Sequence, residues 1–97
     1  MDARRELAEV LRQARNLLGR PGNDFAWSSW EDGPAALAHL DRCIAAVEQG
    51  PLPPRSELTI LFAPTGSIQE VSLSSGWAGE FLALASRFDA SVERVWT

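Results

Sequence analysis

The chain has 97 residues, of which 45% are hydrophobic and 23% charged, and its formal net charge is −4. This length fits a single domain over residues 1–97, and the composition is typical of a globular protein, so neither long disorder nor a coiled coil is expected. No apolar run approaches the roughly 20 residues that span a bilayer, and the N-terminus lacks the apolar core of a signal peptide. We therefore expect a cytoplasmic protein that does not associate with membranes.

Three segments have the apolar spacing of amphipathic helices. Residues 2–18 bring leucines and a valine to one face, and Gly19 is placed to end the helix. Asp32 is placed to cap a second helix over residues 34–49. Large apolar side chains recur at intervals of three and four over residues 76–88, which predicts a third helix with a strongly aromatic buried face.

The segment between the second and third predicted helices favours a β-hairpin. Residues 58–63 are apolar on both faces and include β-branched side chains, as in a strand that is covered on both sides, so we predict a strand over residues 57–63. The turn signal at residues 64–66 then predicts that residues 68–73 return as an antiparallel partner. One alternative stays open, because Ser67 followed by Glu70 matches a capping box, which would start a helix instead.

The C-terminal residues 91–97 alternate and are rich in strand formers, so they can form an edge strand or continue the third helix. The expected fold class is therefore α+β. Two amphipathic helices come first, then a β-hairpin and a third helix, with a C-terminal edge strand if the tail is extended.

The run LFAPTGSIQEVSL, followed by GWAGEFLALASRFD and preceded by WSSW, resembles a family of small bacterial proteins of uncharacterised function. The resemblance covers about half of the chain. It implies a structural unit shared with that family, and it carries no catalytic or binding residues with it.

Few residues offer chemistry. His39 and Cys43 lie four apart on the second predicted helix, so they could meet as a nucleophile and its base. A buried thiol beside a partly exposed imidazole explains the pair without any reaction. A structural zinc site needs four ligands, and the chain has one His and one Cys. No catalytic residue, metal ligand or cofactor is predicted.

The unusual feature is aromatic: four Trp and four Phe occur without a Tyr. Trp27 and Trp30 are three apart, which would place both rings on one side of a short helical turn, and so small a core has limited room for both. Glu31 and Asp32 follow directly. These four residues, Trp27, Trp30, Glu31 and Asp32, are predicted to form a protein-binding face, because exposed Trp is frequent in binding hot spots.

We therefore expect a non-enzymatic interaction module that binds a partner protein or forms a homodimer. One version is an immunity-like protein that neutralises a basic toxin, since charge steers such encounters. The acidic balance disfavours nucleic acid as a partner. The alternative is a small-ligand-binding protein or an enzyme that uses Glu31, Asp32, His39 and Cys43, and one hollow enclosing all four would favour it.

Overall fold

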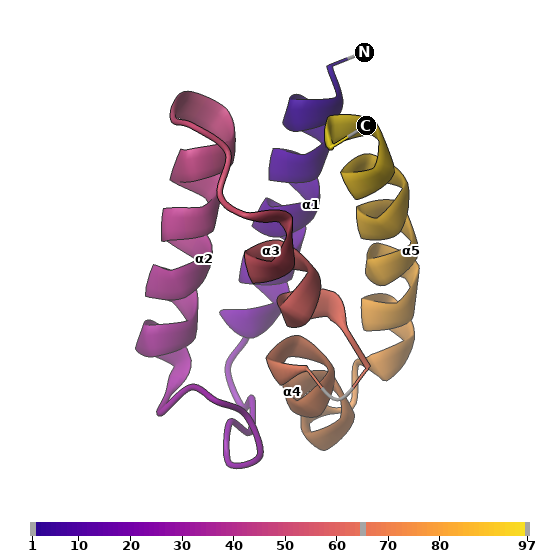
Figure 1. Cartoon of the computed structure of the whole chain (residues 1–97). Helices are drawn as coiled ribbons and strands as arrows, with labels where there is room; N and C mark the ends of the chain where they lie inside the picture. Colours follow the sequence, from indigo (N-terminus) through magenta and orange to yellow (C-terminus); the bar gives the residue numbers. More distant parts are fainter. Residues whose placement is uncertain (1, 65, 97) are drawn as a thin grey trace.

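The computed structural model describes residues 2–64 and 66–96, and this part of the chain folds into helices with no strand. The helices are α1 (Ala3–Leu18), α2 (Gly33–Gln49), α3 (Arg55–Phe62), α4 (Ser67–Ser75) and α5 (Ala78–Val95). α1 packs against both α2 and α5, and the short helices α3 and α4 lie across the same face of this layer (Figure 1). Among the described residues, no helix combines the length and the apolar character that crossing a membrane would require.

The first two helices follow the prediction to within one residue. The carboxylate of Asp32 accepts from the backbone N–H of Ala35 at 3.0 Å, as expected for the N-cap of α2. Arg4 of α1 then reaches the far end of α2, where its guanidinium donates to the carbonyls of Val47 at 2.9 Å and Gly50 at 2.8 Å. These bonds satisfy carbonyls that the end of a helix leaves free, and they tie the two helices together.

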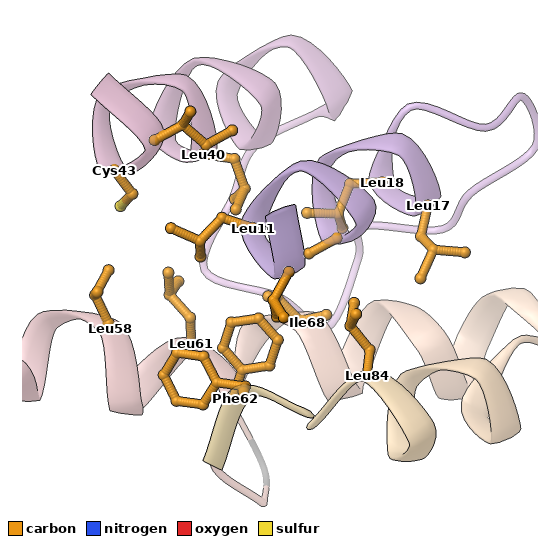
Figure 2. Packing of buried hydrophobic residues seen from close by; sticks show 14 of the residues in the cluster. Leu11, Leu17, Leu18, Leu40, Cys43, Leu58, Leu61, Phe62, Ile68 and Leu84 are labelled. Carbon is orange, nitrogen blue, oxygen red and sulfur yellow. The ribbon is translucent and has the colours of Figure 1, made fainter. Parts of the chain in front are cut away.

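The predicted strand at residues 57–63 is wrong, because this segment forms α3. Leu58, Leu61 and Phe62 are buried, and their spacing of three and four puts them on one side of a helix. Figure 2 shows them pointing from α3 toward Leu11 of α1. Ile60, which made the segment look apolar on both faces, is 65% exposed. A short apolar run is ambiguous between strand and helix, and here the burial of one helical face decides it.

The predicted partner strand at residues 68–73 is also wrong, and with it the α+β class, because this segment forms α4. Ile68, Val71 and Ser72 are buried at helical spacing. The capping box does not form either, because Gly66 holds the N-cap position and no side-chain hydrogen bond from a described residue caps this end of the helix. Gly76 ends α4 at φ 85°, a left-handed conformation that favours glycine, so it closes this helix rather than opening the next.

The third predicted helix is longer than expected. α5 begins at Ala78 and continues to Val95, so the C-terminal segment extends the helix and does not form an edge strand in the described part, which ends at residue 96. Phe88 of α5 stacks on Phe62 of α3 with ring centroids 4.0 Å apart. This contact joins the C-terminal helix to the segment that was expected to be a strand.

Gly66 is required by a close approach of the backbone. A Cβ at this position would lie 2.5 Å from the carbonyl oxygen of Ile60 and 2.9 Å from that of Ala63. We expect Gly66→Ala to lower the free energy of unfolding by about 1–3 kcal/mol, the range for overpacking, because both opposing atoms belong to the backbone. Urea unfolding followed by circular dichroism measures this change. Gly79→Ala is the matched control, since nothing lies within 4 Å of an added Cβ there.

Candidate functional site

The connection between α1 and α2, residues 19–32, is here called the Trp27 loop. Two of its backbone amides are held by the ends of α4. The amide of Asp24 donates to Ser75 Oγ at 2.9 Å, and the amide of Ser29 donates to Ser67 Oγ at 3.2 Å. The segment between these two anchors contains Trp27 and is therefore fixed at both ends on a helix.

Asn23 fixes the start of the same loop. Its Nδ2 donates to the carbonyls of Leu17 at 2.8 Å and Leu18 at 2.9 Å, which are free carbonyls at the end of α1. Its Oδ1 accepts from the indole N–H of Trp77 at 2.9 Å. One amide side chain thus caps α1 and also satisfies a buried indole at the junction of α4 and α5.

Trp27 and Trp30 point to different environments, although they were expected to lie side by side. Trp27 is 74% exposed, whereas Trp30 is 8% exposed and belongs to the core. The loop is a series of turns rather than a helical turn, because Ser28 Oγ donates to the carbonyl of Phe25 at 2.9 Å and accepts from the amide of Trp30 at 3.1 Å. One ring of the predicted face is therefore on the surface, and the other lies beneath it.

Trp30 is held by a specific hydrogen bond. Its indole Nε1–H donates to Nδ1 of His39 at 3.1 Å, and the two rings meet edge to face with centroids 5.9 Å apart. Since Nδ1 accepts this bond, the neutral imidazole carries its proton on Nε2. His39 thus links α2 to the Trp27 loop.

The acidic residues of the loop are exposed. The carboxylate of Asp24 accepts from the amide of Ala26 at 2.9 Å, and that of Asp32 caps α2. Asp24, Glu31 and Asp32 form no ion pair within residues 2–64 and 66–96. Glu31 and Asp32 also line a hollow of about 520 Å³ between the end of α1 and the start of α2.

Two of the four arginines of α1 form ion pairs away from the Trp27 loop. Arg12 and Arg15 pair with Glu48 and Asp41 of α2, the latter at 2.5 Å. Arg20, which follows α1, pairs with Glu80 at 2.8 Å. Arg20 belongs to the Trp27 loop and lines the same hollow as Glu31 and Asp32, but its charge is paired with Glu80. The carboxylates of the loop therefore make its surface negative.

His39 and Cys43 line a different hollow, of about 370 Å³, together with Arg42 and Glu57. The structure brings His39 and Cys43 to one side of α2, but it separates them from Glu31 and Asp32. The four residues of the alternative prediction therefore do not surround one common hollow in the described chain.

The chemistry of the His39 and Cys43 pair is unsuited to nucleophilic attack. Burial raises the pKa of the Cys43 thiol, and the nearby carboxylate of Glu57 raises it further. The attacking species would be the thiolate, which this environment disfavours at neutral pH. His39 offers no base either, because Nδ1 is occupied by Trp30 and Nε2 carries the proton.

The pKa of His39 is lowered, first by burial of the ring and then by the positive charge of Arg42, against an opposing effect of Glu57. The imidazole is therefore neutral at physiological pH and serves as a hydrogen-bond acceptor. Within the part of the chain that the structure describes, no three His, Cys, Asp or Glu residues converge to hold a metal ion.

Comparison of the chain with models of protein families, with curated proteins and with solved structures gives no match. The resemblance to a bacterial family therefore stays a prediction. Function has to be inferred from the geometry of the loop itself.

Several residues that build the site gave no signal in the sequence. Asn23 reads as an ordinary turn residue, and Ser67 and Ser75 read as helix-boundary residues, yet all three position the loop. Their partners lie far away in the chain, so local patterns could not identify them.

Proposed function

We propose that the chain is a non-enzymatic interaction module that binds a basic segment of a partner protein through the Trp27 loop. The observation that carries the proposal is Trp27, an indole that is 74% exposed on a loop held at both ends by α4. A large exposed aromatic side chain in a fixed backbone is a typical anchor of a protein interface.

The hydrogen bonds of the loop support this role energetically. Binding is weakened when a flexible loop has to be ordered on contact with the partner. The amides of Asp24 and Ser29 are already bonded to α4, so most of that ordering is complete in the free protein. The contact area of Trp27 is then available to stabilise the complex.

Charge supports a basic partner. Asp24, Glu31 and Asp32 lie on the same loop as Trp27, and none of them has an ion pair within the described residues. Such carboxylates steer a positively charged segment toward the indole and raise the association rate at low salt. Trp30 is buried, so it stabilises the loop and does not contact the partner.

Neutralisation of a basic toxin is one form of this function, and the cytoplasm is the compartment in which we place it. Self-association is disfavoured as the main role because two negative loops would repel each other. The alternative of a ligand-binding protein or enzyme has weaker support, since Glu31 and Asp32 line one hollow and His39 and Cys43 another.

A random peptide library displayed on phage tests the proposal without a known partner. The immobilised protein is expected to enrich peptides rich in Lys and Arg. For an enriched peptide, Trp27→Ala should weaken binding by about 2 kcal/mol, roughly 30-fold in Kd, the scale of a hot spot. Calorimetry with the purified variants measures this change, and affinity should also fall with added salt.

Leu82→Ala is the matched control, because Leu82 is also a large exposed apolar residue, 61% exposed on α5. It should bind the peptide as the wild type does. Enrichment of acidic or uncharged peptides, or an equal loss of affinity in both variants, would refute the proposed surface. If light scattering shows that the wild type is a dimer and that Trp27→Ala is a monomer, the loop mediates self-association instead.

A further inference from the structure

His39 is the only histidine of the chain, and its imidazole contacts the buried indole of Trp30. Trp30 is buried, and the indole N–H donates to Nδ1 of His39 at 3.1 Å. An imidazole accepts such a bond only while that nitrogen is unprotonated. The end of the Trp27 loop is thus held by a group whose acceptor disappears on protonation.

We propose that His39 is a pH-sensitive latch, which holds the Trp30 end of the Trp27 loop while its imidazole is neutral and releases it when Nδ1 is protonated. Protonation adds a hydrogen at the nitrogen that faces the indole. Two N–H donors then oppose each other, so the bond cannot persist in that geometry. The indole loses its acceptor, and a buried N–H without a partner favours opening of this end of the loop.

The charged groups around His39 have opposite effects on the protonation of its imidazole. Arg42, one turn away on α2, disfavours the imidazolium, and Glu57 of α3, which lines the same hollow, favours it. Cys43 faces the hollow as a protonated thiol and adds no charge. When the ring of His39 is protonated, Glu57 therefore offers it a partner on the side of the hollow. When the ring is neutral, its acceptor nitrogen stays bonded to Trp30.

Two further sets of charged residues lie on the described elements around this region. α1 brings Arg12 and Arg15 to its contact with α2, and each is paired there with a carboxylate. Glu31 and Asp32 follow Trp30 in sequence and line the other hollow, which His39 does not line. The response to pH is therefore assigned to His39 itself.

The direction of the response to pH follows from the lowered pKa of His39 in the folded protein. Above the ordinary histidine pKa of about 6.5 the ring is neutral in closed and open forms alike, and the latch is fully formed. As the pH falls below that value, the open form takes up a proton more readily than the closed form, so its share rises. The response stays local, because Asn23 and Ser29 keep their own bonds to the rest of the fold.

Hydrogen exchange in the free protein tests the latch, so the result does not depend on what the loop binds. The probe is the Trp30 indole N–H observed by NMR, compared between the wild type and His39→Asn at the same pH. The amide oxygen of the variant takes the place of Nδ1 as an acceptor and does not titrate. Comparison at one pH cancels the chemical exchange rate.

At about pH 5 the wild type should exchange this proton about threefold or more faster than His39→Asn, because protonation of His39 then favours the open form. At about pH 7.5 the two proteins should exchange alike, because the wild-type imidazole is then neutral. Equal rates at both pH values, or faster exchange in the variant at the lower pH, would overturn the proposal.

Trp30→Phe provides a second measurement if His39→Asn does not fold. It keeps a ring but removes the N–H that the neutral imidazole accepts. The pKa of His39, followed by its ring protons, should then rise toward its ordinary value, because the neutral form loses its bond. An unchanged pKa in this variant would show that Trp30 and His39 are not coupled and would also overturn the latch.

Discussion

Trp30→Ala is expected to lower the free energy of unfolding by about 3–5 kcal/mol, the range for truncating a large buried aromatic side chain. The indole is 8% exposed and packs in the core, and the substitution also removes its hydrogen bond to His39. A domain of this size has a total stability on the order of 5–15 kcal/mol, so a large part of it would be lost. Urea unfolding followed by far-ultraviolet circular dichroism measures the change.

Trp27→Ala is the matched control, because it removes the same side chain three residues earlier in the same loop. Its indole is 74% exposed, so the free energy of unfolding should change by no more than about 0.5 kcal/mol. A cost for Trp30→Ala as small as that for Trp27→Ala would contradict the burial of Trp30. The pair therefore separates stability from binding: Trp30 supports the loop and Trp27 is the proposed contact.

The first two helices could be read from the sequence because their signals are local and agree with one another. Over residues 2–18 and 34–49 the apolar spacing and the glycines that follow indicate the same elements, and Asp32 marks the start of the second. The short helices lack such agreement. Ile60 completes an apolar run that suggests a strand, and its exposure on α3 follows only from how that helix packs on α4 and α5.

The site could be predicted only in part, for a similar reason. The small size of the core indicated that an indole would remain on the surface, and Trp27 does. Which of the two rings turns inward depends on the turns around Ser28 and on His39, nine residues beyond Trp30. Contacts of this kind join distant segments, and helical periodicity carries no information about them.

Asn23→Ala is expected to lower the free energy of unfolding by about 3 kcal/mol, a large effect for a polar side chain near the surface. Three hydrogen bonds are lost at once: two to the carbonyls of Leu17 and Leu18 and one from the indole of Trp77. Each such bond contributes about 1 kcal/mol, and a buried donor left without a partner costs about 1–3 kcal/mol. Trp77 is 4% exposed, so solvent replaces its lost acceptor poorly.

A double-mutant cycle with Trp77→Phe isolates the indole contribution. Trp77→Phe removes the N–H, so Asn23→Ala in that background no longer leaves a buried donor unsatisfied and should cost about 1–2 kcal/mol less than in the wild type. Equal costs in both backgrounds would mean that the 2.9 Å bond between Trp77 and Asn23 contributes nothing to stability. A coupling of the expected size would show that the side chain of Asn23 joins the start of the Trp27 loop, four residues before the exposed indole, to the N-terminal end of α5.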